Sequence, residues 1–225
     1  MENTHKRILL ATGWITLVTA LIAMIIGHTG SHDLSWETNQ ISTYAATAPY
    51  HGWITAAMIL PCLTLVCISM LVSRYKVLGD TDLAHLVPLF AGAGISGLLT
   101  LAVFKETART MSMLKNSAFD AIRQQSFHDT GLLIFFYSAI LLAVSFGILI
   151  ITQTTVWKKK ILGGLVTLLG LVAFPLMTTP WPHMIGILSV VPGLKQRASL
   201  LSLWLAIALV LIVVSNYILR PSSRR

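Results

Sequence analysis

Long apolar runs alternate with short polar segments along the whole chain. Six of these runs reach the roughly 20 residues that a helix needs to cross the hydrocarbon core of a bilayer. They cover residues 8–27, 52–73, 84–104, 128–152, 161–179 and 200–219. The centres of these runs contain no Asp, Glu, Lys or Arg. The pattern predicts an all-α fold: a polytopic membrane helical bundle with about six transmembrane helices.

One of the longest polar connections carries a helical pattern of its own. Between residues 105 and 126, Met111, Leu114, Ala118 and Ile122 recur at steps of three or four residues. Such spacing indicates a short amphipathic helix lying at the outer surface. A solvated loop is the alternative.

Composition supports a membrane protein in a single domain. Of the 225 residues, 55% are hydrophobic and 11% charged, whereas soluble domains carry about 25% charged residues. No linker or internal repeat divides the chain, so we expect residues 1–225 to form one membrane domain. Cys62 and Cys67 lie within one apolar run, and we expect both to be buried, inert thiols.

The formal charge of +8 comes from 16 Lys and Arg against 8 Asp and Glu. These basic residues fall in the segments between the apolar runs, where they set topology and contact anionic headgroups. We therefore expect membrane lipids as partners, with another membrane protein as a second candidate and no nucleic acid.

The distribution of basic residues predicts the orientation of the helices. With the N-terminus inside, ten basic residues lie in the inner segments and six in the outer ones. The positive-inside rule then places both termini in the cytoplasm. Tyr75, Trp157 and Tyr217 fall at the inner boundary, where aromatic side chains anchor membrane helices.

Residues 92–97 read Gly-Ala-Gly-Ile-Ser-Gly and match the dinucleotide-binding fingerprint. That motif works at the start of a helix, where free backbone N–H groups meet a pyrophosphate. Here it lies in the middle of an apolar run. The small residues instead predict close packing against another helix.

Histidines gather toward the predicted outer face. His28 and His32 are four residues apart, a usable metal-ligand spacing on a helix. The candidate metal ligands, for which zinc is the natural ion, are His28, His32, His51, His128 and Asp129. The alternative is that interfacial histidines and carboxylates hydrate and contact headgroups. The absence of Asp, Glu, Lys and Arg at the centres of the runs argues against an ion-coupled transporter.

Three short motifs are similar to those of a known family. They are Ile41-Ser42-Thr43-Tyr44-Ala45-Ala46, Phe104-Lys105-Glu106 followed by His128, and Gly193-Leu194-Lys195-Gln196-Arg197. Together with the helix order, they resemble the six-helix membrane family catalogued as domain of unknown function 998, found mainly in bacteria and archaea. The resemblance implies residence in the bacterial cytoplasmic (inner) membrane. It singles out His128 and Arg197, with Gln196 where an acidic residue is common in the family.

These observations define an expected outer polar cluster. It consists of His28, Asp33, His32, His51, Glu106, His128, Asp129, Gln196 and Arg197. The sequence contains no complete catalytic constellation, so the leading hypothesis is a non-enzymatic protein that binds a lipid or a partner through this outer rim. The alternative is a metal-dependent, membrane-embedded hydrolase with an outward-facing His/Asp site, and only that alternative calls for zinc.

Overall fold

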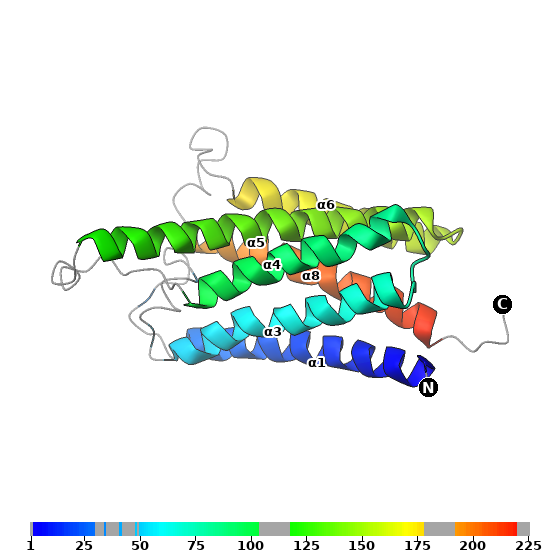
Figure 1. The fold of residues 1–225 in the computed structure, drawn as a ribbon, viewed down its shortest axis with the longest axis horizontal. Helices are drawn as coiled ribbons and strands as arrows, with labels where there is room; N and C mark the ends of the chain where they lie inside the picture. The colour runs from blue at the N-terminus through cyan, green and yellow to red at the C-terminus, as the bar shows by residue number, and fades with distance from the viewer. Residues whose placement is uncertain are drawn as a thin grey trace.

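Figure 1 shows the computed structural model, an elongated bundle of helices. The structure describes residues 2–29, 34, 41, 48, 50–103, 118–177 and 192–219. In this part of the chain the helices are α1 (Glu2–Thr29), α3 (His51–Ser69), the π-helical η1 (Met70–Arg74), α4 (Asp82–Val103), α5 (Ala118–Thr152), α6 (Trp157–Met177) and α8 (Pro192–Ile218). The predicted all-α bundle is confirmed.

Helix length and composition support the membrane assignment. The stretches long and apolar enough to cross a membrane are Glu2–Thr29, His51–Arg74, Asp82–Val103, Ser126–Thr152 and Gly193–Ile218. Helix α6, with 21 residues, overlaps the remaining predicted run, and its crossing of the membrane stays a prediction.

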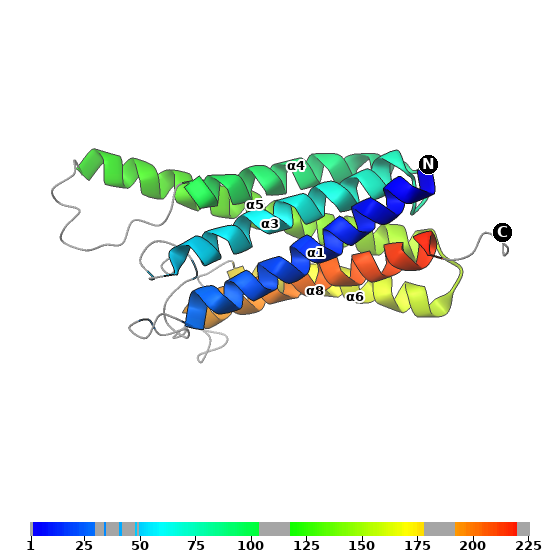
Figure 2. The ribbon, with the colours of Figure 1, turned by 90° about the horizontal axis from the view of Figure 1, so that it is seen from below.

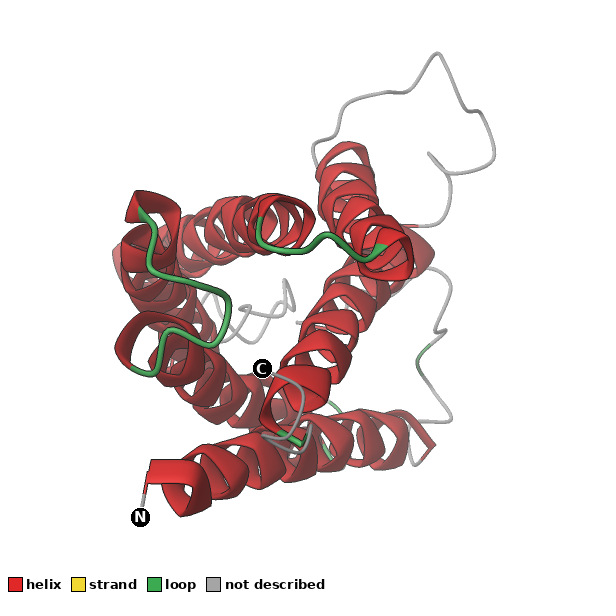
Figure 3. Ribbon diagram, turned by 90° about the vertical axis from the view of Figure 1, so that its right-hand side faces the viewer, coloured by secondary structure: helices red, strands yellow, loops and turns green. Residues whose placement is uncertain are grey.

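The helices form a ring in chain order. Each helix packs against the next one along the chain, and α8 closes the ring by contacting both α6 and α1. Viewed along the long axis, the helices surround a common centre (Figure 3). Helix α1 begins and α8 ends at the same end of the bundle (Figures 1 and 2). Following the predicted orientation, we call this the inner end and the opposite one the outer end.

Glycines allow the closest contacts in the bundle. A Cβ added at Gly97 of α4 would lie 2.5 Å from the backbone N of Phe135 on α5. On the other side of α5, a Cβ at Gly163 of α6 would lie 2.8 Å from the carbonyl O of Gly147. Small residues at helix crossings are typical of membrane bundles. Gly97 belongs to the dinucleotide-like motif, and its position confirms that the motif packs helices.

The prediction of a separate surface helix is wrong for the second half of that segment. Residues from Ala118 onward form the first turns of α5, which extends beyond the rest of the bundle (Figure 1). The apolar run that predicted the span begins only at residue 128, because the preceding turns are polar enough to lie outside the hydrocarbon. Residues 105–117 of the prediction lie outside the described part of the chain.

The inner end of α3 finishes in a π-helical turn and a tight connection to α4. Lys76 and Gly79 adopt positive φ angles of 49° and 93°, and a side chain at Gly79 would collide with Gln153, which follows the end of α5. The hydroxyl of Thr81 then accepts a hydrogen bond from the backbone N–H of Ala84 at 3.2 Å, which caps the start of α4.

Both predicted buried thiols are confirmed, because Cys62 and Cys67 are free and buried.

Candidate functional site

The interior of the ring contains two small neighbouring cavities. They share four lining residues, Pro61, Leu98, Phe135 and Trp204, and so follow one another along the bundle. The cavity nearer the outer end is lined by Met24, Ile41, Ala57, Met58, Leu101, Leu132, Phe136, Gln196 and Leu200 besides these four. The deeper cavity, lined by apolar side chains alone, reaches down to Phe146 and Val210. Together they form an apolar interior space. Among the described residues that line it, the polar side chain is Gln196, at the outer end.

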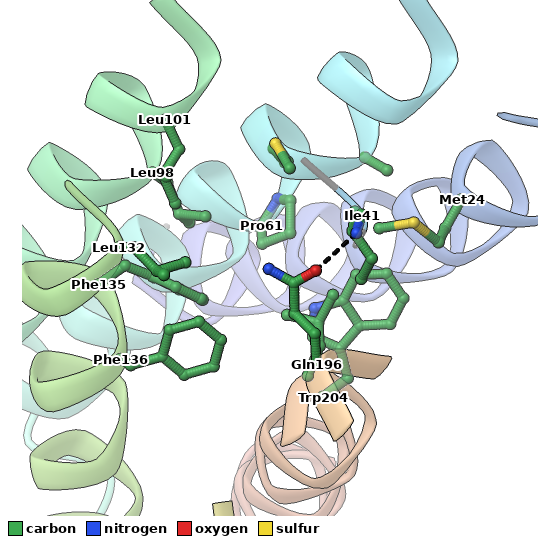
Figure 4. A pocket seen from close by; sticks show the side chains of 13 residues that line it. Met24, Ile41, Pro61, Leu98, Leu101, Leu132, Phe135, Phe136, Gln196 and Trp204 are labelled. Atoms are coloured by element: carbon green, nitrogen blue, oxygen red, sulfur yellow. Dashed lines mark hydrogen bonds between the residues drawn. The ribbon is translucent and has the colours of Figure 1, made fainter. Parts of the chain in front are cut away.

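That polar side chain is Gln196, in the second turn of α8. Its Oε1 atom accepts the backbone N–H of Ile41 at 2.5 Å. Figure 4 shows the amide of Gln196 directed toward Ile41, with Phe135 and Phe136 on the opposite side of the space. Ile41 is itself 3% exposed. A piece of the first outer connection is therefore fixed over the outer end of the cavity.

Arg197, the next residue, bridges α8 to α1. Its Nη2 atom lies 2.8 Å from Nε2 of His28, and Nδ1 of His28 lies 2.7 Å from the carbonyl O of Met24. The carbonyl can only accept and the guanidinium can only donate. His28 is therefore the neutral tautomer with its proton on Nδ1. Because Met24 also lines the cavity, this chain of hydrogen bonds lies beside its outer end.

His128 points the same way as the cavity-lining face of α5. It is 4% exposed, while its neighbours Phe127 and Asp129 are exposed. The cavity residue Leu132 follows one helical turn later, so both side chains lie on one face of α5. His128 is therefore a buried residue one helical turn before the cavity residue Leu132.

The remaining predicted residues are not all part of this arrangement. His51 is exposed at the start of α3, where its Nδ1 lies 3.2 Å from the carbonyl O of Ala48. Asp129 is exposed as well. His32, Asp33 and Glu106 lie outside the residues that the structure describes.

A metal site would draw its ligands from these same histidines and carboxylates. In the described ranges, no group of three or more His, Cys, Asp or Glu side chains could hold a metal ion. Of the five candidate ligands, His28 uses both ring nitrogens in hydrogen bonds to Met24 and Arg197. The metal hypothesis stays a prediction that needs the residues of the first outer connection.

Sequence reasoning missed the cavity itself. Its lining residues belong to helices that are apolar on all sides, since the outer faces of the helices meet lipid. No hydrophobic periodicity separates an inward from an outward face in such a helix. The available signals were Pro61 inside α3 and Gln196 between two basic residues just before the last apolar run.

A ring of long apolar helices around an apolar interior defines a multi-pass integral membrane protein of the α-helical class. Within this class, the chain belongs to the family of proteins of unknown function DUF998, which it matches over residues 14–213. The expected family membership is confirmed. Neither the curated proteins nor the solved structures contain a match to this chain.

Proposed function

We propose that the protein binds a lipid-like amphiphile, with the apolar chain in the interior cavities and the polar head at the outer end. The observation that carries this proposal is the continuity between an apolar interior and the polar groups of Gln196, Arg197 and His28 at one end of it. The lining of both cavities is almost entirely apolar, as an acyl chain requires.

Selectivity for such a ligand must come from its head. A chain that moves from the bilayer into a protein cavity exchanges one apolar environment for another, so the hydrophobic effect contributes little. Hydrogen bonds at the outer end are different, because their partners are scarce in lipid. The guanidinium of Arg197 carries several N–H donors in a fixed fork, and His28 and α8 hold it in place. A head rich in acceptor oxygens matches these donors.

The site supports binding more directly than catalysis. The positioned groups are a guanidinium, an amide and a neutral imidazole, which orient and neutralise a ligand without supplying a nucleophile. We also propose that the protein resides in a bacterial cytoplasmic membrane. The phospholipids of that membrane are therefore the first ligands to test.

Filling the cavity tests this proposal. Leu98 is 4% exposed and lines both cavities, whereas the next residue, Leu99, is 45% exposed and faces outward. We expect Leu98→Trp to remove the lipid that copurifies with the wild-type protein, as measured by native mass spectrometry. Leu99→Trp adds the same volume outside the ring and should retain the lipid.

Two results would contradict the proposal. One is wild-type protein that carries no lipid after gentle detergent extraction. The other is equal lipid retention by the two folded tryptophan variants, which would place the copurified lipid on the outer surface of the bundle.

A further inference from the structure

Lys159, in the first turn of α6, is nearly fully buried at the inner end of the bundle. Its side chain is 7% exposed, and its Nζ atom lies 3.6 Å from the centroid of the Tyr217 ring on α8. A lysine this buried ordinarily has an anionic partner. Among the described residues, the ion pairs do not include Lys159. The cation–π contact compensates the buried charge only in part.

Other cations at this end do have carboxylate partners. Lys6 pairs with Glu2 at 2.6 Å, and Asp80 bonds both Lys76 and, at 3.1 Å, His85. Lysines 158 and 160 flank Lys159 on the chain. Three consecutive lysines also add to the positive end of the α6 dipole instead of opposing it. The start of α6 is therefore a local excess of positive charge.

The Nζ atom of Lys159 keeps some accessible surface. In the part of the chain that the structure describes, no fully buried side-chain nitrogen or oxygen lacks a hydrogen-bond partner. No such bond is made by Nζ of Lys159, so this atom keeps an opening to its surroundings. Beside it, Trp157 is 73% exposed. An exposed tryptophan at the end of a membrane helix is typical of the headgroup layer.

We propose that Lys159 and Tyr217 form a binding site for the phosphate of an anionic phospholipid at the inner end of α6 and α8. The phosphate supplies the negative charge that the buried ammonium and the helix end both favour. The Tyr217 ring holds the ammonium in place and closes its inner side. Trp157 lies at the depth of the glycerol backbone of the same lipid. This site is at the opposite end of the molecule from the outer cavity and is independent of what that cavity binds.

Native mass spectrometry of the detergent-purified protein tests this site with phosphatidylglycerol and phosphatidylcholine as probes. We expect the wild-type protein to retain phosphatidylglycerol preferentially. Lys159→Gln should weaken phosphatidylglycerol binding about fivefold, the effect of one lysine close to an anionic headgroup. Lys158→Gln removes the same charge from an exposed position and should weaken binding less.

A second pair of variants separates the site from a general effect of charge. Tyr217→Phe keeps the ring and should bind phosphatidylglycerol as the wild type does, whereas Tyr217→Leu removes the ring and should weaken binding. This pair leaves Lys159 intact and stays informative when Lys159→Gln does not fold.

Three outcomes would overturn the proposal. Equal retention of phosphatidylcholine would show that no anion is selected. Equal losses in Lys158→Gln and Lys159→Gln would show a diffuse basic surface instead of a site. Displacement of the lipid by inorganic phosphate at millimolar concentration would show a site for soluble anions.

Discussion

The proton position on His28 decides what Arg197 can do. With its proton on Nδ1, bonded to the carbonyl of Met24, the imidazole presents a lone pair on Nε2 to the guanidinium. The pair therefore keeps a single positive charge and a fixed orientation of the arginine fork. A protonated His28 would present a second donor and a like charge to Arg197, and this contact would be lost. His28 thus acts as a positioning residue for Arg197.

A double-mutant cycle measures this positioning. His28→Leu removes the acceptor, and Arg197→Gln replaces the guanidinium with a shorter amide that does not reach His28; each change should lower the free energy of unfolding by about 1–2 kcal/mol. Because both changes break the same contact, the double variant should lose less than the sum. Equilibrium unfolding in mixed micelles supplies the four values.

A control for this cycle lies at the same end of α1 as His28. Thr29→Val alters an exposed residue next to His28 and should combine additively with Arg197→Gln. Additive losses for His28→Leu and Arg197→Gln would show that the two side chains do not interact, and would remove the structural basis of the outer site.

At the scale of elements, hydroxyl groups join α1 to α3. The hydroxyls of Thr16 and Thr64 lie 2.7 Å apart, and Thr64 also donates to the carbonyl O of Gly13 at 3.3 Å. Such bonds satisfy hydroxyls in the hydrocarbon region and contribute about 0.6 kcal/mol each. Gly13 is in addition close to Cys67 of α3, which gives a direct test of the helix register.

A cysteine at position 13 should form a disulfide with Cys67. The Cβ atom of such a residue would lie 3.6 Å from the Cβ of Cys67, within the range of about 3.5–4.5 Å found in disulfides. Mild oxidation of Gly13→Cys should therefore remove two thiols, as counted by maleimide labelling and intact mass. Leu211, at 3.3 Å from the same position, needs only a small adjustment.

Gly92→Cys is the matched control. It lies on α4 with no neighbouring atom within 4 Å of its added Cβ, so its thiol should stay free under the same oxidation. Failure of folded Gly13→Cys to form the bond would contradict the packing of α1 against α3.

At the scale of the whole molecule, the apolar runs predicted the spans because bilayer thickness sets the length of a crossing helix. The apolar runs are shorter than the helices wherever a helix continues beyond the hydrocarbon core. Helix α1 starts at Glu2 and includes Lys6 and Arg7 before its apolar run. Helix α6 starts at Trp157 and includes three lysines before its apolar run. Charged residues end an apolar run, but they are good helix formers and need not end a helix.

The candidate site was only partly predictable. The family motifs pointed to Gln196, Arg197 and His128. In the structure Gln196 lines the outer cavity, Arg197 contacts His28, and His128 is buried on α5. The partnership of His28 with Arg197 depends on how the ring closes between α1 and α8. The cavities depend on the same closure. Neither leaves a pattern in a chain whose helices meet apolar surroundings on both sides.

Photolabelling by a phospholipid that carries a diazirine in its acyl chain is the most direct measurement of the central claim, that the ring encloses a lipid chain. We predict that mass spectrometry of the labelled protein finds adducts on the cavity residues Leu98, Phe135 and Trp204. Adducts confined to exposed residues such as Leu89 and Leu133 would show that lipid surrounds the bundle without entering it, and would contradict the account.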